Sequence, residues 1–148
     1  MKKPLEDLPQ PKWIVVDDFE FICFNLAKEL MEFNEPIPEY STRDNSLLES
    51  SLASPRISYE LTNSSLSEQA SVLFYSLIKN HPFKNGNKRI AVTALLIFLS
   101  LNEKWIEISP HLLYEIAVLV AESLPKQKDF VVNKNTEIFK KFIVSNKP

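Results

Sequence analysis

Apolar side chains recur every three or four positions along most of this 148-residue chain, which is the pattern of amphipathic helices. One such run follows Asp17 and Asp18, and either residue is a good helix N-cap. The apolar positions of this run are Phe19, Ile22, Leu26, Leu30 and Phe33. Further helices are predicted over residues 46–53, 65–80, 87–102, 109–123 and 135–146.

Start signals support two of these helices. Ser65 and Glu68 have the spacing of a capping box, and Ser109 stands directly before Pro110, a pair typical of a helix N-terminus. The helix over residues 87–102 is instead apolar on nearly every side. We therefore expect it at the centre of a bundle, with its N-terminus facing the loop that precedes it.

The stretch from Arg56 to Asn63 has a different period. Ile57, Tyr59 and Leu61 alternate with polar residues, as in a β-strand or one arm of a hairpin. Pro55 stands just before this stretch and is expected to end the preceding helix. An exposed hairpin flap is therefore predicted here.

The organisation of the chain is simple. Residues 1–16 are rich in proline and polar residues and are interpreted as an N-terminal tail, and residues 17–148 as a single domain. No repeat and no low-complexity segment interrupts that domain. The predicted fold class is all-α, a compact helical bundle with one small β-hairpin flap.

Composition narrows the classes of function. The formal net charge of −2 and the pI near 5.7 argue against a protein that binds nucleic acid through bulk electrostatics. The longest apolar run, residues 90–101, is too short to span a membrane, and the first residues do not have the pattern of a secretory signal. The single Cys23 lies among apolar residues and is expected to be an inert buried thiol. A soluble, cytoplasmic protein is expected.

The segment "NHPFKNGNKR", residues 80–89, holds the only glycine of the chain, Gly86, directly before the predicted central helix. A glycine loop at a helix N-terminus presents free backbone N–H groups and the positive end of the helix dipole, which together bind anions. Lys88 and Arg89 would oppose that dipole unless an anion lies near them. The loop is therefore predicted to bind phosphate.

Other side chains of the loop suit group transfer. His81 could accept a proton from a hydroxyl, Asn85 offers an oxygen for a metal ion carried in by phosphates, and Lys84 adds a cation. This set is typical of phosphoryl or nucleotidyl transfer, in which positioning and charge stabilisation carry most of the catalysis. The alternative is an ordinary polar turn between two helices, with Lys88 and Arg89 on a solvated face.

The segment resembles the signature of the Fic/Doc family, in its Doc (death-on-curing) form H-x-F-x-[DN]-[AG]-N-K-R. The specified positions are matched by His81, Phe83, Asn85, Gly86, Asn87, Lys88 and Arg89. Upstream, "TRDNSLLESSLASPR" is similar to a segment common in death-on-curing proteins, so the resemblance covers about residues 17–123. It implies a helical bundle that transfers a group from ATP, with Mg²⁺, to a protein hydroxyl.

The resemblance also implies roles for the matched residues. His81 would be the general base, Asn85 would help to hold the metal, and the backbone of Gly86 and Asn87 would form an anion hole. Lys88 would bind phosphate, and Lys84 and Arg89 are assigned to the same nucleotide site.

Three positions distinguish this chain from the adenylylating branch of the family, and one of them, Lys88, marks the Doc branch. Adenylylating members carry H-P-F-x-[DE]-G-N-G-R-x-x-R, whereas this chain has Asn85 in place of the acid, Lys88 in place of the second glycine and Val92 in place of the last arginine. Lysine in place of the second glycine is the mark of the Doc branch. Members of that branch resemble kinases, and they modify a translation elongation factor and arrest growth. A protein Ser/Thr phosphotransferase is therefore favoured. AMP transfer is the runner-up, and a non-catalytic module that binds nucleotide or a partner is the alternative of another class.

Partners are expected from the same resemblance. The predicted flap would align a target protein through Arg56, Ile57 and Tyr59, and an ordinary surface hairpin is the alternative for this segment. No regulatory segment of the kind that restrains many Fic proteins is complete in the chain, so an antitoxin protein that inhibits in trans is predicted. A homo-oligomer is possible, and the sequence does not decide it. No direct contact with nucleic acid or membrane is expected.

Overall fold

The computed structural model describes residues 10–30 and 35–146, and the predicted helical position Phe33 lies outside them. In chain order the elements are α1 (Val16–Phe19), a π-helical turn η2 (Glu20–Phe24), α2 (Asn25–Leu30), a 3-10 turn η3 (Tyr40–Thr42), α3 (Asn45–Thr62), α4 (Leu66–Lys79), α5 (Asn87–Leu101), β1 (Lys104–Ile106), α6 (Pro110–Glu122), a 3-10 turn η4 (Pro125–Gln127), α7 (Lys128–Phe142) and β2 (Ile143–Ser145).

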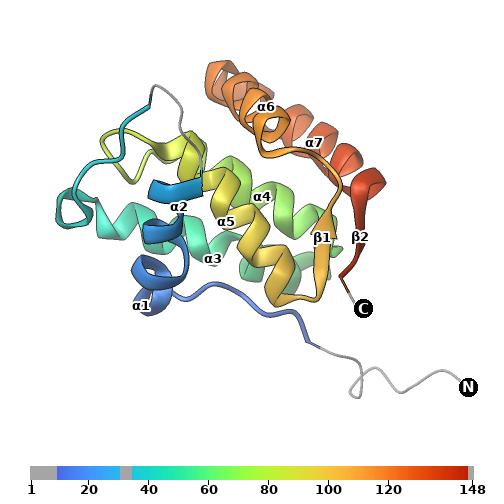
Figure 1. Ribbon diagram of the computed structural model, residues 1–148. Coiled ribbons are helices and arrows are strands. Elements are labelled where there is room, and N and C mark those ends of the chain that lie inside the picture. The colour runs from blue at the N-terminus through green and yellow to red at the C-terminus, as the bar shows by residue number, and fades with distance from the viewer. Residues whose placement is uncertain (1–9, 31–34, 147–148) are drawn as a thin grey trace, which may run out of the picture.

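Helix α5 forms the centre of the bundle, as the sequence predicts. Its side chains from Ile90 to Leu96 are all buried, and it contacts α4, α6, α2, η2 and β1. Figure 1 shows α5 running through the middle of the molecule, with α6 and α7 on one side of it and α3 on the other. A helix that is apolar all round can be stable only in such a position.

Helix α4 packs against α5 and carries α3 and α7 on its other faces. Ser65 caps it by accepting a hydrogen bond from the backbone N–H of Glu68 at 3.2 Å, which confirms the predicted start. Phe74 lies edge-on to Phe139 of α7, with 5.6 Å between ring centroids. These contacts make α4 and α5 the scaffold that holds the loop between them.

Helix α3 corrects the sequence prediction, because it continues through Pro55 and includes residues 56–62, which were predicted as a strand. Proline has no N–H to donate to the carbonyl of Ser51. The hydroxyl of Ser54 donates to that carbonyl at 2.7 Å instead, so the oxygen keeps a partner. The helix ends at Thr62, and the capping residue Asn63 that follows has a left-handed φ of 52°.

The first helical segment buries Phe19, as predicted, but after that residue it buries a different face from the predicted one. In η2 the N–H of Asn25 bonds to the carbonyl of Glu20, five residues back, and this π-helical turn rotates the residues that follow. Cys23 and Ala27 are fully buried as a result. The predicted core positions Ile22, Leu26 and Leu30 are 37%, 36% and 52% exposed. The helix also begins at Val16 without a side-chain cap, and the two aspartates lie in its first turn.

The small sheet lies elsewhere than the predicted flap. Strands β1 and β2 pair antiparallel, with Trp105 opposite Val144, and the two helices α6 and α7 separate them in the chain. Residues 143–145, predicted as helix, are strand, and α7 begins at Lys128, earlier than predicted. The fold is all-α with one two-stranded sheet, and no helix in the described ranges is long and apolar enough to cross a membrane.

Candidate active site

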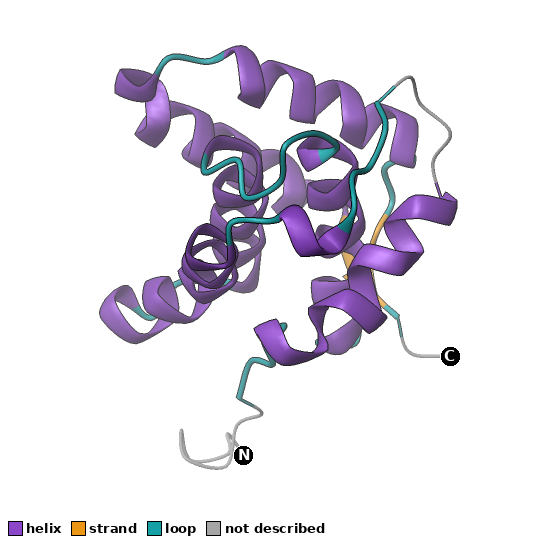
Figure 2. Ribbon diagram, turned by 90° about the vertical axis from the view of Figure 1, so that its left-hand side faces the viewer, coloured by secondary structure: helices purple, strands orange, loops and turns teal. Residues whose placement is uncertain are grey.

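Phe83 anchors the loop between α4 and α5 to the core. Its side chain is 2% exposed, and its ring lies 5.2 Å from that of Phe24, 6.3 Å from that of Phe19 and 6.1 Å from that of Tyr40, measured between centroids. The carbonyl of the neighbouring Pro82 accepts a hydrogen bond from the N–H of Asp44 at 2.8 Å, so the loop is also tied to the start of α3. Figure 2 views the molecule from the left-hand side of Figure 1, where this loop lies.

Asn87, the first residue of α5, closes the loop from inside. Its Oδ1 accepts from the N–H of Phe83 at 3.0 Å, and its Nδ2 donates to the carbonyl of Phe83 at 2.8 Å. The same Nδ2 lies 2.6 Å from Nδ1 of His81. The side chain is 4% exposed, so these three contacts are largely shielded from water.

The polar side chains expected to do chemistry lie on the outer side of this loop. His81, Lys84 and Asn85 are all exposed. His81 has a φ of 55°, a left-handed conformation that is uncommon for a non-glycine residue and is often found at functional sites. Oδ1 of Asn85 accepts from the N–H of Gly86 at 2.8 Å, which shapes the approach to α5.

Gly86 meets a backbone demand, as its being the only glycine suggests. Its φ is 78°, in the left-handed region that favours glycine. A Cβ at this position would lie 2.9 Å from Cγ1 of Ile37 and 3.2 Å from the carbonyl oxygen of Pro36. The close neighbour that requires glycine is therefore another segment of the same chain, packed against the loop.

The N-terminus of α5 presents open donors beside Gly86. The first backbone bond of the helix runs from the N–H of Ile90 to the carbonyl of Gly86, and no side chain in the described part of the chain caps the three N–H groups before it. Such a terminus carries a partial positive charge and binds anions. Open backbone donors of the kind that an anion site requires therefore lie at the start of α5.

Lys88 lies beside this terminus and is paired with Glu35. Its Nζ is 3.4 Å from Oε1 of Glu35, and the two side chains are 28% and 8% exposed. The hydroxyl of Tyr114, from α6, donates to Oε2 of the same glutamate at 2.5 Å. Burial, and then this hydrogen bond, raise the pKa of the Tyr114 phenol. The anion that the helix terminus requires near Lys88 is thus partly supplied from within the chain.

Glu35 and Tyr114 belong to the site, although the sequence did not point to them. They lie 79 positions apart, in segments without a motif of their own. The one available signal was indirect, since a cation in the first turn of a helix calls for a nearby anion.

Arg89 differs from its predicted role at the phosphate site. Its guanidinium points into the bundle, donating from Nη1 to the carbonyl of Glu35 at 2.7 Å and from Nη2 to those of Ala27 at 3.0 Å and Lys28 at 3.4 Å. The residue is 7% exposed, and its Nε is buried with no hydrogen-bond partner among the described residues. In this structure Arg89 joins the end of α2 to α5 and does not face the outside of the loop.

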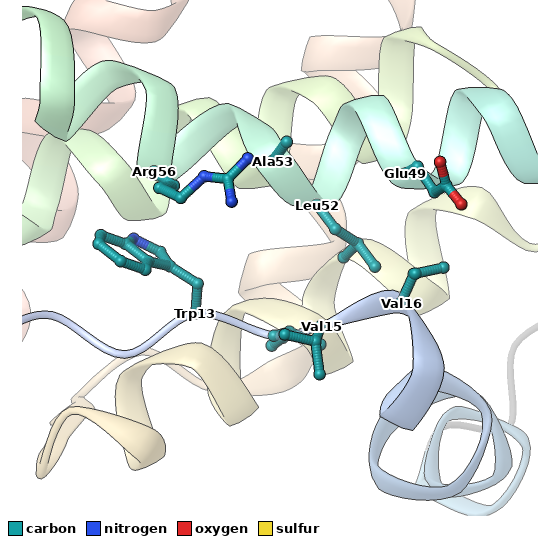
Figure 3. A pocket seen from close by; sticks show the side chains of 8 residues that line it. Trp13, Val15, Val16, Glu49, Leu52, Ala53 and Arg56 are labelled. Atoms are coloured by element: carbon teal, nitrogen blue, oxygen red, sulfur yellow. The ribbon is translucent and has the colours of Figure 1, made fainter.

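The three residues predicted as a target-docking flap lie on α3 instead. Arg56 is 3.9 Å from Glu60 and lines a groove of about 500 Å³ between α3 and the segment that holds Trp13 (Figure 3). Tyr59 packs its ring 5.8 Å from that of Trp13, and Ile57 is 47% exposed. No residue of the loop lines this groove. The prediction of a flap strand over Arg56–Leu61 is wrong, because these residues are part of helix α3.

Neither a metal cluster nor a reactive thiol stands out beside the loop. Within residues 10–30 and 35–146, no group of three or more His, Cys, Asp and Glu side chains could hold a metal ion. Asn85, the predicted metal residue, offers one exposed amide oxygen. Burial raises the pKa of the Cys23 thiol, which fits the inert role predicted for it.

Comparison with known proteins completes the description of this site. The family model described as "Fic/DOC family" matches residues 19–99, more than half of the chain and the whole loop between α4 and α5. Proteins of this family generally transfer nucleotide-derived groups to other proteins and typically use ATP with Mg²⁺. Neither the curated proteins nor the solved structures contain a match. The match spans the end of α1 through most of α5, and the chain belongs to the Fic/DOC family.

Proposed function

We propose that this chain is a Doc-like toxin that transfers the γ-phosphate of ATP to a Ser or Thr hydroxyl of a protein, with a translation elongation factor as the expected kind of target. The observation that carries the proposal is Lys88 at the N-terminus of α5. Its ammonium group is partly exposed and lies 3.4 Å from Oε1 of Glu35. Adenylylating relatives have glycine there, and a side chain in that place crowds the phosphate pose that AMP transfer requires.

The loop suits a polyphosphate. Open N–H groups at the start of α5, together with the partly exposed Lys88 and the exposed Lys84, give it donors and positive charge at one place. Asn85 supplies one oxygen for Mg²⁺, and the described residues hold no acidic cluster for the ion, so the metal would be held mainly by the phosphates that it arrives with. When bound, ATP with Mg²⁺ supplies the phosphoryl group and neutralises part of its charge.

The chain's own residues divide the work. His81 accepts the proton of the target hydroxyl, and its exposed position on the loop leaves room for a protein substrate. The N–H groups of α5 hold the phosphate, and Lys88 stabilises its charge. Glu35 competes with the phosphate for Lys88, so the pair sets how tightly the site binds anions.

An inhibitor protein acting in trans is part of the same proposal. The π-helical turn leaves apolar side chains on the outside of the N-terminal helical segment, where Phe21 is 78% exposed and Leu30 is 52% exposed. A contiguous apolar patch on a surface is typical of a site that binds another protein. An antitoxin segment with an apolar face would cover these side chains.

Label transfer tests the proposed reaction. Purified protein is incubated with a bacterial lysate, Mg²⁺ and ATP labelled at either the α or the γ phosphate. The γ label is expected on one protein, with a mass gain of about 80 Da for one phosphoryl group. His81→Ala should abolish the transfer, whereas His111→Ala, which changes the other histidine outside the loop, should retain it.

Two other outcomes would overturn the proposal that this chain is a kinase. Transfer of the α label would establish AMP transfer and show that Lys88 does not block that pose. Binding of ATP without transfer of either label would establish the non-catalytic module, for which Asn85 in place of an acid and the inward Arg89 already provide some support.

A further inference from the structure

The orientation of the Asn87 amide follows from its contacts with the backbone of Phe83. The N–H of Phe83 can only donate, so the atom 3.0 Å from it must be the amide oxygen. The carbonyl of Phe83 can only accept, so the atom 2.8 Å from it must be the amide nitrogen. Because both contacts are buried, exchanging the two atoms would leave two unsatisfied backbone groups.

This orientation determines which nitrogen of His81 carries the proton. The atom of Asn87 that lies 2.6 Å from Nδ1 of His81 is the amide nitrogen, which has hydrogens and no acceptor capacity. Nδ1 must therefore be the acceptor and bear no hydrogen. A neutral imidazole held in this way carries its single hydrogen on Nε2.

A ring in this state has no nitrogen available to accept a proton. The lone pair of Nδ1 is used by Asn87, and Nε2 already bears hydrogen. We propose that Asn87 is a positioning residue that holds His81 in the Nε2–H tautomer and keeps it from acting as a base until an anion draws the amide N–H away. This inference rests on the proposed role of His81 as the general base.

The place of Asn87 in the fold explains why an anion would have this effect. Asn87 is the first residue of α5, so its side chain starts at the helix terminus where the open N–H groups lie. A phosphate oxygen is a stronger hydrogen-bond acceptor than an imidazole nitrogen, because it carries charge. An anion bound at the terminus therefore competes with His81 for the amide N–H and leaves the ring free to reorient.

Nuclear magnetic resonance of ¹⁵N-labelled protein tests the contact directly. The N–H···N bond should give a scalar coupling between Nδ2 of Asn87 and Nδ1 of His81. The ring should show hydrogen on Nε2 alone, rather than the mixture found for a histidine in a short peptide. The chain has only two histidines, so the spectrum of His81→Ala assigns the signals of His81.

Two additions complete the test. Inorganic triphosphate with Mg²⁺ should shift the amide signals of α5 and abolish the coupling. Asn87→Asp, in which a carboxylate can accept from Nδ1, should move the hydrogen from Nε2 to Nδ1. The unshifted amide signal of Phe24 would show that this variant keeps the core around the loop.

The inference is overturned if the wild-type ring carries hydrogen on Nδ1 or shows the peptide-like mixture. Its release step is overturned if triphosphate leaves the coupling unchanged, whether it binds or not. None of these measurements requires turnover. If label transfer fails and the coupling is present, the kinase proposal is overturned and the tautomer assignment stands. If label transfer succeeds and the coupling is absent, the tautomer assignment is overturned and the kinase proposal stands.

Discussion

The two sides of the loop between α4 and α5 differ sharply in what surrounds them. The outer side consists of the exposed residues His81, Lys84 and Asn85. The inner side consists of the buried residues Phe83, Gly86, Asn87 and Arg89. The inner groups contact distant parts of the chain, whereas the outer side chains are exposed and make contacts only within the loop and the start of α5. A single short motif thus contains both the exposed polar side chains expected to do chemistry and the buried residues that anchor the loop to the core.

This difference teaches that a matched residue is not automatically a ligand residue. Arg89 matches the motif as well as His81 does, yet its guanidinium binds carbonyls of α2 and of Glu35. Substitutions on the inner side, except at Asn87 with its contact to His81, should therefore act mainly on stability, and substitutions on the outer side on chemistry.

Phe83→Ala should break the inner side with the largest effect. Removing a ring that is 2% exposed and packs against three other rings should lower the free energy of unfolding by about 3–5 kcal/mol. His81→Ala, on the outer side, removes one hydrogen bond to Asn87 and should lower it by only about 0.5–1.5 kcal/mol. Urea denaturation followed by circular dichroism measures both. Equal losses in the two variants would contradict the division between the two sides.

Arg89→Met should have the next largest effect. It removes the charged hydrogen bonds to three carbonyls, and a loss of roughly 1.5–3 kcal/mol of unfolding free energy is expected. Lys84→Met is the matched control, since it removes an exposed cation from the same loop. Thermal denaturation of the two variants compares them. If Arg89→Met kept full stability and lost phosphate binding, Arg89 would belong to the outer side after all.

Glu35→Gln should sharpen the comparison by freeing Lys88. Without the carboxylate 3.4 Å from Nζ, inorganic triphosphate should bind about tenfold more tightly, which corresponds to about 1.4 kcal/mol. Isothermal titration calorimetry measures this change. Glu39→Gln, which removes an exposed charge from the same segment, should leave the affinity nearly unchanged. Equal gains in both variants would mean that only net charge matters.

The smallest expected effect concerns Tyr114. Burial and its hydrogen bond to Glu35 raise the pKa of this phenol in the folded protein, so the unfolded chain ionises first as pH rises. Stability from this group is therefore complete below about pH 10 and decreases above it. Tyr114→Phe lacks that decrease, so its difference in stability from the wild type should narrow above pH 10. Urea titrations from pH 8 to 11 would show it, and a constant difference would contradict the pKa shift.

Much of the fold follows from the sequence, because local signals and packing agree there. Helices α4, α5 and α6 lie where their periodicity and caps predict. Helix α3 was misjudged because the rule that proline ends a helix does not foresee that Ser54 would satisfy the carbonyl of Ser51. The face of the first helical segment was misjudged because a π-helical turn leaves no mark in an i, i+3, i+4 pattern.

The site was predictable only in part, for a related reason. The motif identifies the loop, and the requirement for glycine at position 86 can be inferred from its being the only one. The direction of Arg89 and the presence of Glu35 depend on which distant segments pack against the loop. The alternation of apolar and polar residues over 56–61 also suggested a strand. These residues are part of helix α3, where Tyr59 packs against Trp13.

The close approach of Ile37 to Gly86 has a consequence for the order in which sequence changes can accumulate. The Doc pattern accepts alanine at this position, but here the new methyl group would meet Cγ1 of Ile37 at 2.9 Å and the carbonyl of Pro36 at 3.2 Å. A lineage of this protein could therefore reach alanine only after position 37 had become smaller and the segment had moved outward. The reverse order would pass through a strained intermediate, so past change at one position constrains the other.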